Sequence, residues 1–406
     1  TYGSSLTGLT IGKSGNTANI TSNTAMTVAG PINLYGGNIA VNAPMTATND
    51  TVSLNASGTV TDGAAGYVVA DKLALIGGSV TLDHVSNSVN TIAASGVSGL
   101  TYVNAGALTI GVVNPTGISA TGDVRIETLT GDLTVSENVS TTSTTATAVL
   151  LNAGKSTAAG TATGGNIVIS GTPTITAGTG GTIRLMSGSV ASSTGLTALV
   201  GSGTGRFRYN SDEASNGYTL ALGANVVNAI YRERPTANAT ITSYSEIYGF
   251  DHNQTLSNLK TDGSLVSTSR TALNGDETVA GLGLTIGSPV YSTGNKLKYS
   301  ATPYTLTDGL AKLGYAMSQT GGSQLSVTKK ELTFAGLVIS NKVYDGNTTA
   351  NLGIGSVTLP NKIAGDVVSV SSVTGAFDTQ HVGTGKTVSI TTGTLTGDDA
   401  ANYTIS

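Results

Sequence analysis

Residues 32–82 read INLYGGNIAVNAPMTATNDTVSLNASGTVTDGAAGYVVADKLALIGGSVTL, and this stretch decides the predicted fold. Within it, Ile32-Asn33-Leu34, Val52-Ser53-Leu54 and Leu73-Ala74-Leu75 repeat an aliphatic–small–aliphatic triplet at intervals of 20 and then 21 residues. In an extended segment this alternation places both aliphatic side chains on one face and the small one on the other. Similar short runs lie between the triplets, so each interval has room for two or three strands. The pattern predicts an all-β chain that begins as a β-solenoid.

The composition excludes several classes of protein. Charged residues make up 10% of the 406 residues, Gly accounts for 55 of them, and the formal net charge is −4. No cluster of Lys and Arg is present to neutralise phosphates, so we expect no nucleic-acid partner. No apolar run approaches the ~18 residues of a spanning helix, so we expect no membrane insertion. Cysteine is absent, which excludes disulfides, zinc–thiolate sites and thiol nucleophiles.

A change in composition near Arg206 marks a domain boundary. All four Phe residues and 11 of the 15 Tyr residues lie beyond it. A narrow solenoid interior favours Val, Ile, Leu and Ala, whereas a compact β domain needs larger side chains to close its core. We therefore predict a β-helical shaft over residues 1–230, followed by two small β-rich modules of sandwich or grasp type over residues 231–330 and 331–406.

The two modules share landmarks at similar spacings. Asp276 precedes Tyr315 by 39 residues, and Asp366 precedes Tyr403 by 37 residues. In the first module the segment after Tyr315 continues through Gly321-Gly322 into a second apolar run, which predicts a closing hairpin. The sequence stops before an equivalent run in the second module, so we expect it to be a fragment of a longer protein.

Motifs rich in Tyr, Asp and Gly gather in the second module. They are Lys342-Val343-Tyr344-Asp345-Gly346-Asn347-Thr348-Thr349-Ala350, Ala364-Gly365-Asp366, Phe377-Asp378, Val382-Gly383-Thr384-Gly385-Lys386 and Leu395-Thr396-Gly397-Asp398-Asp399-Ala400-Ala401-Asn402-Tyr403. Together they closely resemble the YDG repeat of large bacterial surface exoproteins. The first module is similar to the MBG-type repeat that often accompanies it, on the strength of Tyr248-Gly249, Asn274-Gly275-Asp276 and Leu325-Ser326-Val327-Thr328-Lys329-Lys330.

The shaft carries a second resemblance. Residues from Asn87-Ser88-Val89-Asn90-Thr91-Ile92-Ala93-Ala94 through Leu108-Thr109-Ile110-Gly111 are similar to the β-helical shafts of filamentous-haemagglutinin-type exoproteins, which two-partner secretion exports. The resemblance implies a right-handed parallel β-helix, an outer-membrane transporter as partner, a secreted or cell-surface location and an adhesive role, as in biofilms. The secretion domain of that family, with its Asn-Pro-Asn motifs, is missing. Asn114-Pro115-Thr116-Gly117 resembles those motifs only weakly. Export by this route is therefore inferred from association.

Four acidic residues form the densest candidate for catalysis, because β-helices also serve polysaccharide lyases and glycosidases. They are Asp123, Glu127, Asp132 and Glu137. Both Asp residues follow Gly, which is ordinary turn chemistry, and Arg125 is the only local basic residue that a lyase would need. We therefore predict no catalytic residues and no enzyme activity, and keep a β-helical polysaccharide-active enzyme with accessory modules as the alternative function.

Metal and cofactor sites have little support in the sequence. The three histidines, His84, His252 and His381, are isolated from one another and from ligand partners at motif spacing. The calcium nonapeptide of β-rolls is absent, although Asp345 and Asp398-Asp399 carry the right chemistry to contribute to a single site. Turn formation explains Tyr344-Asp345-Gly346 fully, since Asp bonds its own backbone and Gly accepts a positive φ. We predict no metal and no cofactor.

Exposed aromatic residues are the usual platform for a sugar ring, and the shaft has few of them before Arg206. We predict glycan contacts at Tyr35 and Tyr102. The sequence as a whole predicts a rod and spacer from a large secreted surface adhesin, which contributes to adhesion to cells, matrix or exopolysaccharide. The expected partner is an exopolysaccharide or a glycan of a host or bacterial surface.

Overall fold

The computed structural model describes residues 6–241, 244–253, 266–268, 285–307, 310–320 and 324–405. These residues form two compact units. The first unit holds residues 6–237 and 310–317, and the second holds the other described residues from 238 onward. The predicted landmarks Asn274-Gly275-Asp276 and Gly321-Gly322 lie outside the described residues.

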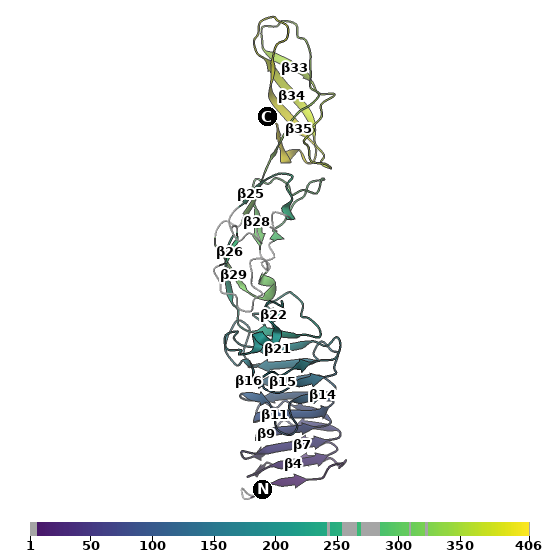
Figure 1. Ribbon diagram of the computed structural model, residues 1–406, viewed down its shortest axis with the longest axis vertical. Coiled ribbons are helices and arrows are strands. Elements are labelled where there is room, and N and C mark those ends of the chain that lie inside the picture. Colours follow the sequence, from purple (N-terminus) through teal and green to yellow (C-terminus); the bar gives the residue numbers. More distant parts are fainter. Residues whose placement is uncertain are drawn as a thin grey trace. The chain divides into compact units, whose positions relative to one another are not determined.

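The first unit is a parallel β-solenoid whose strands stack in long ladders (Figure 1). One ladder follows the order β1 (Leu9–Ile11), β4 (Ile32–Gly36), β7 (Thr51–Ala56), β9 (Val68–Ile76), β11 (Ser88–Val97), β13 (Leu108–Ile110), β16 (Leu133–Val135) and β19 (Ile167–Ile169). The other follows β2 (Ile20–Ser22), β5 (Ile39–Val41), β8 (Thr59–Asp62), β10 (Ser79–Leu82), β12 (Gly99–Asn104), β15 (Val124–Thr128), β18 (Val149–Ala153), β21 (Ile183–Ser187), β23 (Val227–Tyr231) and β22 (Phe207–Arg208). Shorter stacks are formed by β3 (Met26–Val28) with β6 (Met45–Ala47), and by β14 (Ile118–Ala120), β17 (Val139–Thr141) and β20 (Ile175–Thr176).

The triplets that decide the fold stack on one another in register. Leu54 on β7 pairs with Leu34 on β4 and with Leu75 on β9, and none of the three is more than 1% exposed. Ser53 lies between the buried positions of β7 and is partly exposed. Identical faces therefore repeat from coil to coil, and each coil buries its aliphatic side chains against the next. This confirms the prediction of an all-β chain with a parallel β-solenoid.

Glycine and asparagine form the turns between the ladders. Gly77 and Gly78 have φ of 68° and 67° between β9 and β10, a conformation that other residues adopt at a cost. A Cβ atom at Gly78 would lie 2.2 Å from the carbonyl oxygen of Gly58 in the preceding coil. At another turn the Asn38 side chain accepts the Thr59 amide hydrogen at 2.8 Å, so a side chain of one coil satisfies the backbone of the next.

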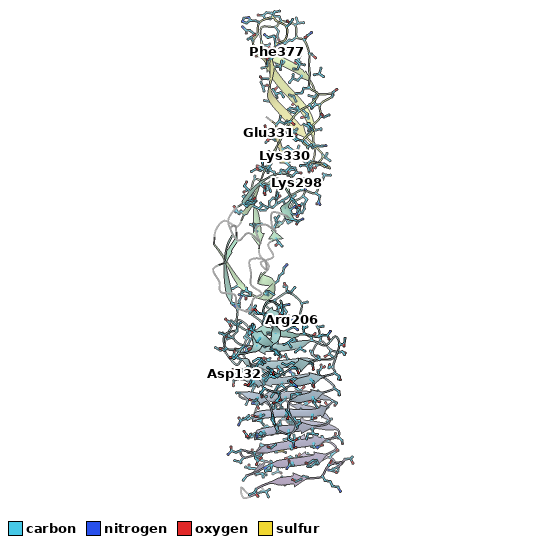
Figure 2. The ribbon with its side chains drawn as sticks, in the orientation of Figure 1. Asp132, Arg206, Lys298, Lys330, Glu331 and Phe377 are labelled. Carbon is cyan, nitrogen blue, oxygen red and sulfur yellow. The ribbon has the colours of Figure 1, made fainter. Side chains whose placement is uncertain are left out.

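Aromatic residues close the solenoid where the last strands β22 and β23 pair. Phe207, Tyr209 and Tyr231 are fully buried, and the rings of Tyr209 and Tyr231 stack at 5.6 Å. The short helix α1 (Leu196–Val200) buries Leu196 and Val200 nearby. Arg206 lies at this end of the solenoid (Figure 2). The change in composition near Arg206 therefore coincides with the last coils of the solenoid.

A buried charged side chain directly follows β23. Arg232 is 1% exposed, and its guanidinium donates to the carbonyl oxygens of Ala153, Thr163 and Gly165 at 2.6–3.0 Å. Burial lowers the pKa of Arg232 to about 10, against an opposing effect of Asp212. The charged group ties the loop after β18 to the end of the solenoid.

The second unit consists of small sheets. They are built from β24 (Thr236–Ile241), β25 (Tyr244–Ile247), β26 (Val266–Thr268), β27 (Thr285–Ile286), β28 (Tyr304–Thr307), β29 (Ala316–Thr320), β30 (Gln324–Thr328), β31 (Lys330–Leu332), β32 (Val338–Ile339), β33 (Thr349–Gly353), β34 (Ser369–Phe377), β35 (Val388–Thr396) and β36 (Tyr403–Ile405), of which β24 and β29 begin in the first unit. The sheet orders are β26-β24-β29, β25-β30-β28-β27, β31-β36 and β32-β33-β34-β35. Short 3₁₀ helices η2 (Leu310–Leu313) and η3 (Ala400–Asn402) precede Tyr315 and Tyr403. The prediction of small β-rich structure after the solenoid is confirmed.

Candidate functional site

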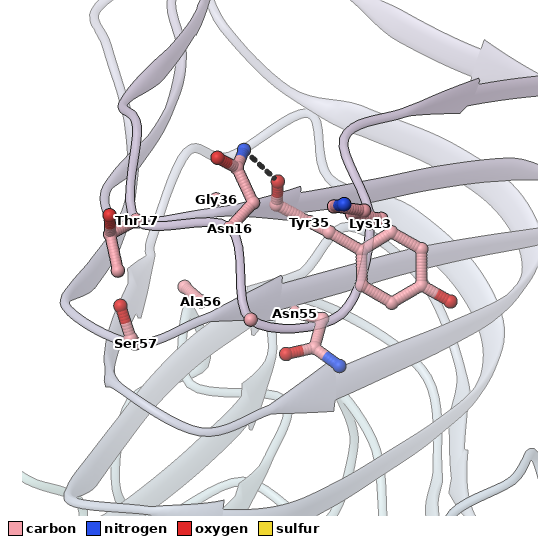
Figure 3. A pocket seen from close by; sticks show the side chains of 9 residues that line it. Lys13, Asn16, Thr17, Tyr35, Gly36, Asn55, Ala56 and Ser57 are labelled. Carbon is pink, nitrogen blue, oxygen red and sulfur yellow. Dashed lines mark hydrogen bonds between the residues drawn. The ribbon is translucent and has the colours of Figure 1, made fainter.

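A pocket opens on the outer surface of the first coils, around Tyr35 (Figure 3). It has a volume of about 150 Å³ and is lined by Lys13, Gly15, Asn16, Thr17, Tyr35, Gly36, Asn55, Ala56 and Ser57. Tyr35 and Asn55 are register partners on β4 and β7, so their side chains are neighbours on the outer face. The loop between β1 and β2 forms the opposite wall.

Local backbone chemistry shapes this loop. The Asn16 side chain donates to the carbonyl oxygen of Tyr35 at 2.7 Å and accepts the amide hydrogen of Ala18 at 3.2 Å. Gly12 has φ of 80°, and a Cβ atom there would lie 2.2 Å from the Tyr35 carbonyl oxygen. Only glycine allows the loop to turn this close to β4. The pocket wall is therefore fixed to the strand that carries Tyr35.

The chemistry of the pocket suits a saccharide. It combines the aromatic ring of Tyr35 with the amide groups of Asn16 and Asn55 and with two hydroxyl groups. Aromatic rings offer a platform for apolar sugar faces, and amides and hydroxyls match sugar hydroxyls. Lys13 is exposed, and no acidic side chain lines the pocket. A cation without a carboxylate beside it favours a sugar that carries a negative charge.

Tyr102 lies inside the solenoid, which corrects its prediction as a glycan contact. It is 0% exposed, and its hydroxyl donates to Asn104 Oδ1 at 2.9 Å. Burial raises the pKa of the Tyr102 hydroxyl. The alternation in Leu100-Thr101-Tyr102 places the ring on the same face as Leu100, so the sequence itself carries the signal for burial.

Asn104 is a structural residue that sequence reasoning missed. It is 1% exposed, and its amide donates to the carbonyl oxygens of Val89, Gly106 and Ala107 at 3.0–3.1 Å. Its side-chain oxygen also accepts the amide hydrogen of Val89 at 2.9 Å. One buried amide therefore completes the backbone hydrogen bonding at a coil corner, together with the Tyr102 hydroxyl.

The four predicted acidic residues divide between the two ladders. Asp123 and Glu127 lie before and on β15 of one ladder, whereas Asp132 and Glu137 lie before and after β16 of the other. Asp132 lies on the solenoid surface and accepts the Asn166 amide hydrogen at 2.8 Å (Figure 2). The four carboxylates therefore do not line one groove.

Asp123 is held by hydroxyl groups from the following coil. Ser143, Thr145 and Thr147 all donate to its carboxylate, the last two at 2.8 and 2.7 Å. Burial alone would raise the pKa of Asp123, but these hydrogen bonds outweigh it and lower the pKa. The arrangement stabilises an ionised carboxylate and fixes the Thr-rich loop before β18.

Glu127 is the one acidic residue of the four at the centre of a charged network. Its side chain is 0% exposed and forms ion pairs with Arg125 at 2.8 Å and Lys155 at 2.5 Å. Arg125 also pairs with Glu213 at 2.8 Å. Burial raises the pKa of Glu213, and the neighbouring Glu127 raises it further, whereas hydrogen bonds outweigh burial at Glu127 and lower its pKa. The two carboxylates thus influence each other, with the pKa of Glu127 lowered and that of Glu213 raised.

The three histidines occupy separate places. The His84 ring stacks on Tyr67 at 5.4 Å, and the His252 ring lies 5.4 Å from that of Tyr291. Within the described part of the chain, no three His, Asp or Glu side chains come together as a metal site would require. Asp345 accepts the Asn347 amide hydrogen at 3.1 Å and pairs with Lys342 at 2.7 Å.

Among the described residues, no helix has the length and apolarity to cross a membrane.

A protein family matches the C-terminal part of the chain. The YDG domain model matches residues 328–406, which confirms the resemblance for that part of the sequence. No curated protein and no solved structure matches. The described residues of the matched part contain the sheets β31-β36 and β32-β33-β34-β35.

Proposed function

We propose that this chain is part of the stalk of a large secreted bacterial surface adhesin, in which solenoid and β modules act as rod and spacer. The observation that supports the proposal most is the presence of a parallel β-solenoid and a YDG domain in one chain. The proposal places the chain outside the cell and assigns its export to an outer-membrane transporter of two-partner secretion. It treats residues 231–330 as an MBG-type module.

The solenoid suits a spacer because it gains length in proportion to sequence. Each additional coil of about 20 residues adds one inter-strand spacing of about 4.8 Å and contacts only its neighbours. The interior is built from aliphatic side chains, and the fully buried carboxylate of Glu127 is paired with Arg125 and Lys155. Weak contacts suffice for adhesion when many copies act together.

The Tyr35 pocket is the proposed point of contact with an acidic saccharide, such as a polyuronate or a sulfated glycan. The test is an array of immobilised carboxylated, sulfated and neutral polysaccharides, probed with the 406-residue chain on multivalent beads. Binding to either acidic class above the neutral class, reduced by salt, is the expected result. Equal binding to all three classes, or to none, would overturn the assignment of an acidic ligand.

The alternative is a polysaccharide-active enzyme, and one observation favours it. Glu127 and Glu213 have pKa values shifted in opposite directions, as acid and base groups often do. However, Glu127 is buried and its two oxygens are bound by Arg125 and Lys155, so this carboxylate is not open to a substrate. Size analysis of the polysaccharides after incubation separates the two functions, because shortened chains that disappear with Glu127→Gln would support the enzyme.

A further inference from the structure

A buried carboxylate joins the YDG domain to the segment that precedes it. Asp366 is 4% exposed and accepts the hydroxyl hydrogens of Tyr248 at 2.5 Å and of Tyr403 at 2.6 Å. It also accepts from the Ser292 hydroxyl at 2.9 Å and from the Gly294 amide at 3.0 Å. Asp366 and Tyr403 belong to the YDG match, whereas the other three donors precede it. We call this set the tyrosine joint.

A second carboxylate of the YDG domain supports the tyrosine joint. Asp399 is fully buried, accepts the Val367 amide hydrogen at 2.9 Å and lies 3.4 Å from Lys298 Nζ. The rings of Tyr248 and Tyr403 meet edge to face at 5.2 Å. The joint thus combines aromatic packing with charge-assisted hydrogen bonds, which are the stronger kind.

The first unit contains a similar arrangement of elements. There η2 precedes Tyr315, as η3 precedes Tyr403. The Tyr315 ring meets that of Tyr209 edge to face at 4.6 Å, and the Tyr209 amide donates to the Leu313 carbonyl oxygen at 2.8 Å. In both places a short 3₁₀ helix and its tyrosine pack on a tyrosine from an earlier part of the chain.

The YDG domain has another tyrosine, which lies at its surface. Tyr344 is 63% exposed, and the neighbouring Val343 is 89% exposed. Tyr344 shortly precedes Gly346, with φ of 77°, as Tyr248 precedes Gly249, with φ of 100°. Each tyrosine therefore lies one or two residues before a glycine with positive φ, Tyr248 in a buried position and Tyr344 in an exposed one.

A second loop widens this apolar surface. Val382 is 85% exposed in the loop between β34 and β35. The Phe377 amide donates to the Thr348 carbonyl oxygen at 2.7 Å, so this loop and the loop of Tyr344 leave the same end of the sheet. Exposed apolar side chains gathered at one end are typical of an interaction surface.

We propose that the Tyr344 end of the YDG domain is a docking surface for a second copy of the same domain. The second copy of the domain lacks Tyr248, Ser292 and Gly294, which fill the site in this chain. The Tyr344 hydroxyl would therefore donate to the carboxylate of that copy's Asp366, and its ring would pack on that copy's Tyr403. The occupant follows from the tyrosine joint, in which the YDG domain itself receives Tyr248 in this way. The proposal goes beyond adhesion, since it holds for a stalk with any ligand.

The test uses the full chain with an added domain. Residue 406 is followed by a second copy of residues 318–406. Tyr344 of the added copy alone is changed to Phe, so that the original Tyr344 can be followed separately. Nitration of that tyrosine by tetranitromethane is measured by mass spectrometry in the 406-residue chain and in the extended chain. We expect the extended chain to protect Tyr344 on the order of tenfold, because its exposure would then require local opening.

Two variants complete the test. Asp366→Ala in the added copy should restore fast nitration of Tyr344, whereas Asp398→Ala in the added copy, at an exposed position, should leave it protected. Tyr248 serves as the internal reference, because its 1% exposure predicts slow nitration in both chains. Equal nitration of Tyr344 in the two chains, with Tyr248 protected in both, would overturn the proposal.

Discussion

Replacement of Asp366 tests the tyrosine joint quantitatively. Asp366→Ala removes the acceptor of four hydrogen bonds at 2.5–3.0 Å. The hydroxyls of Tyr248 and Tyr403 are the most enclosed donors, since the two residues are 1% and 3% exposed. A buried donor left without a partner costs about 1–3 kcal/mol, so the two together predict a loss of about 2–6 kcal/mol in the free energy of unfolding of the second unit. Asp366→Asn keeps the shape and one oxygen, and should cost about 1–2 kcal/mol.

Hydrogen exchange and urea unfolding provide the assay. The two units can unfold separately, so exchange at single amides reports the second unit more cleanly than one global midpoint. We expect Asp366→Ala to accelerate exchange of the Gly294 amide, which donates to Asp366 at 3.0 Å. Asp398→Ala is the matched control, because Asp398 is exposed and Lys298 contacts only its carbonyl oxygen. A loss below about 0.5 kcal/mol for Asp366→Ala, no larger than for a surface substitution, would refute the reasoning.

Three further results are expected. Leu54→Ala in the solenoid should lower the free energy of unfolding by about 2–5 kcal/mol in urea titrations, whereas Ser53→Ala should change it by less than about 0.5 kcal/mol. Similar effects of the two substitutions would contradict the placement of Leu54 in the interior and of Ser53 on the outer face. The lowered pKa of Glu127 gives stability that is present above the ordinary Glu pKa of about 4.3 and is lost as the pH falls below it. Glu127→Gln should therefore reduce the loss of folding stability at acid pH. An unchanged loss at acid pH would contradict this. Burial and the neighbouring Asp366 carboxylate raise the pKa of Tyr248 and Tyr403. The second unit should therefore lose stability as the pH rises above the ordinary Tyr pKa of about 10. Absorbance near 295 nm reports tyrosine ionisation, and ionisation of these tyrosines before any loss of structure would contradict the prediction.

The solenoid was predictable because its information is local and repeated. The pairs Leu34–Leu54 and Leu54–Leu75 lie about one coil apart in sequence, so the period itself gives the register. The same alternation correctly places Tyr35 on the outer face of β4. It also contradicts Tyr102 as a glycan contact, because Tyr102 shares a face with Leu100. The period-2 alternation therefore determines the face of an aromatic residue as strictly as that of an aliphatic one.

The charged and aromatic contacts were not predictable, because their partners are distant in the sequence. Arg125 meets Glu213, 88 residues later, and Tyr248 meets Asp366, 118 residues later. No periodic signal relates such positions, and a motif such as Ala364-Gly365-Asp366 reveals a turn but not the donors that converge on its carboxylate. Arg232 shows the same limit, since three carbonyl oxygens from earlier loops surround a residue that local chemistry assigns to the surface.

Affinity of the Tyr35 pocket for an acidic polysaccharide is the measurement that tests the proposed adhesive role most directly. Dissociation constants for the 406-residue chain are compared with those of Tyr35→Ala and Lys13→Ala, with Lys72→Ala as the matched control at another exposed lysine of the solenoid. Loss of the ring should weaken binding about 3- to 10-fold, and loss of Lys13 about 2- to 5-fold in a salt-dependent manner, whereas Lys72→Ala should leave it unchanged. Equal affinities for all four proteins would contradict the account, as would shortening of the polysaccharide by the unmodified chain.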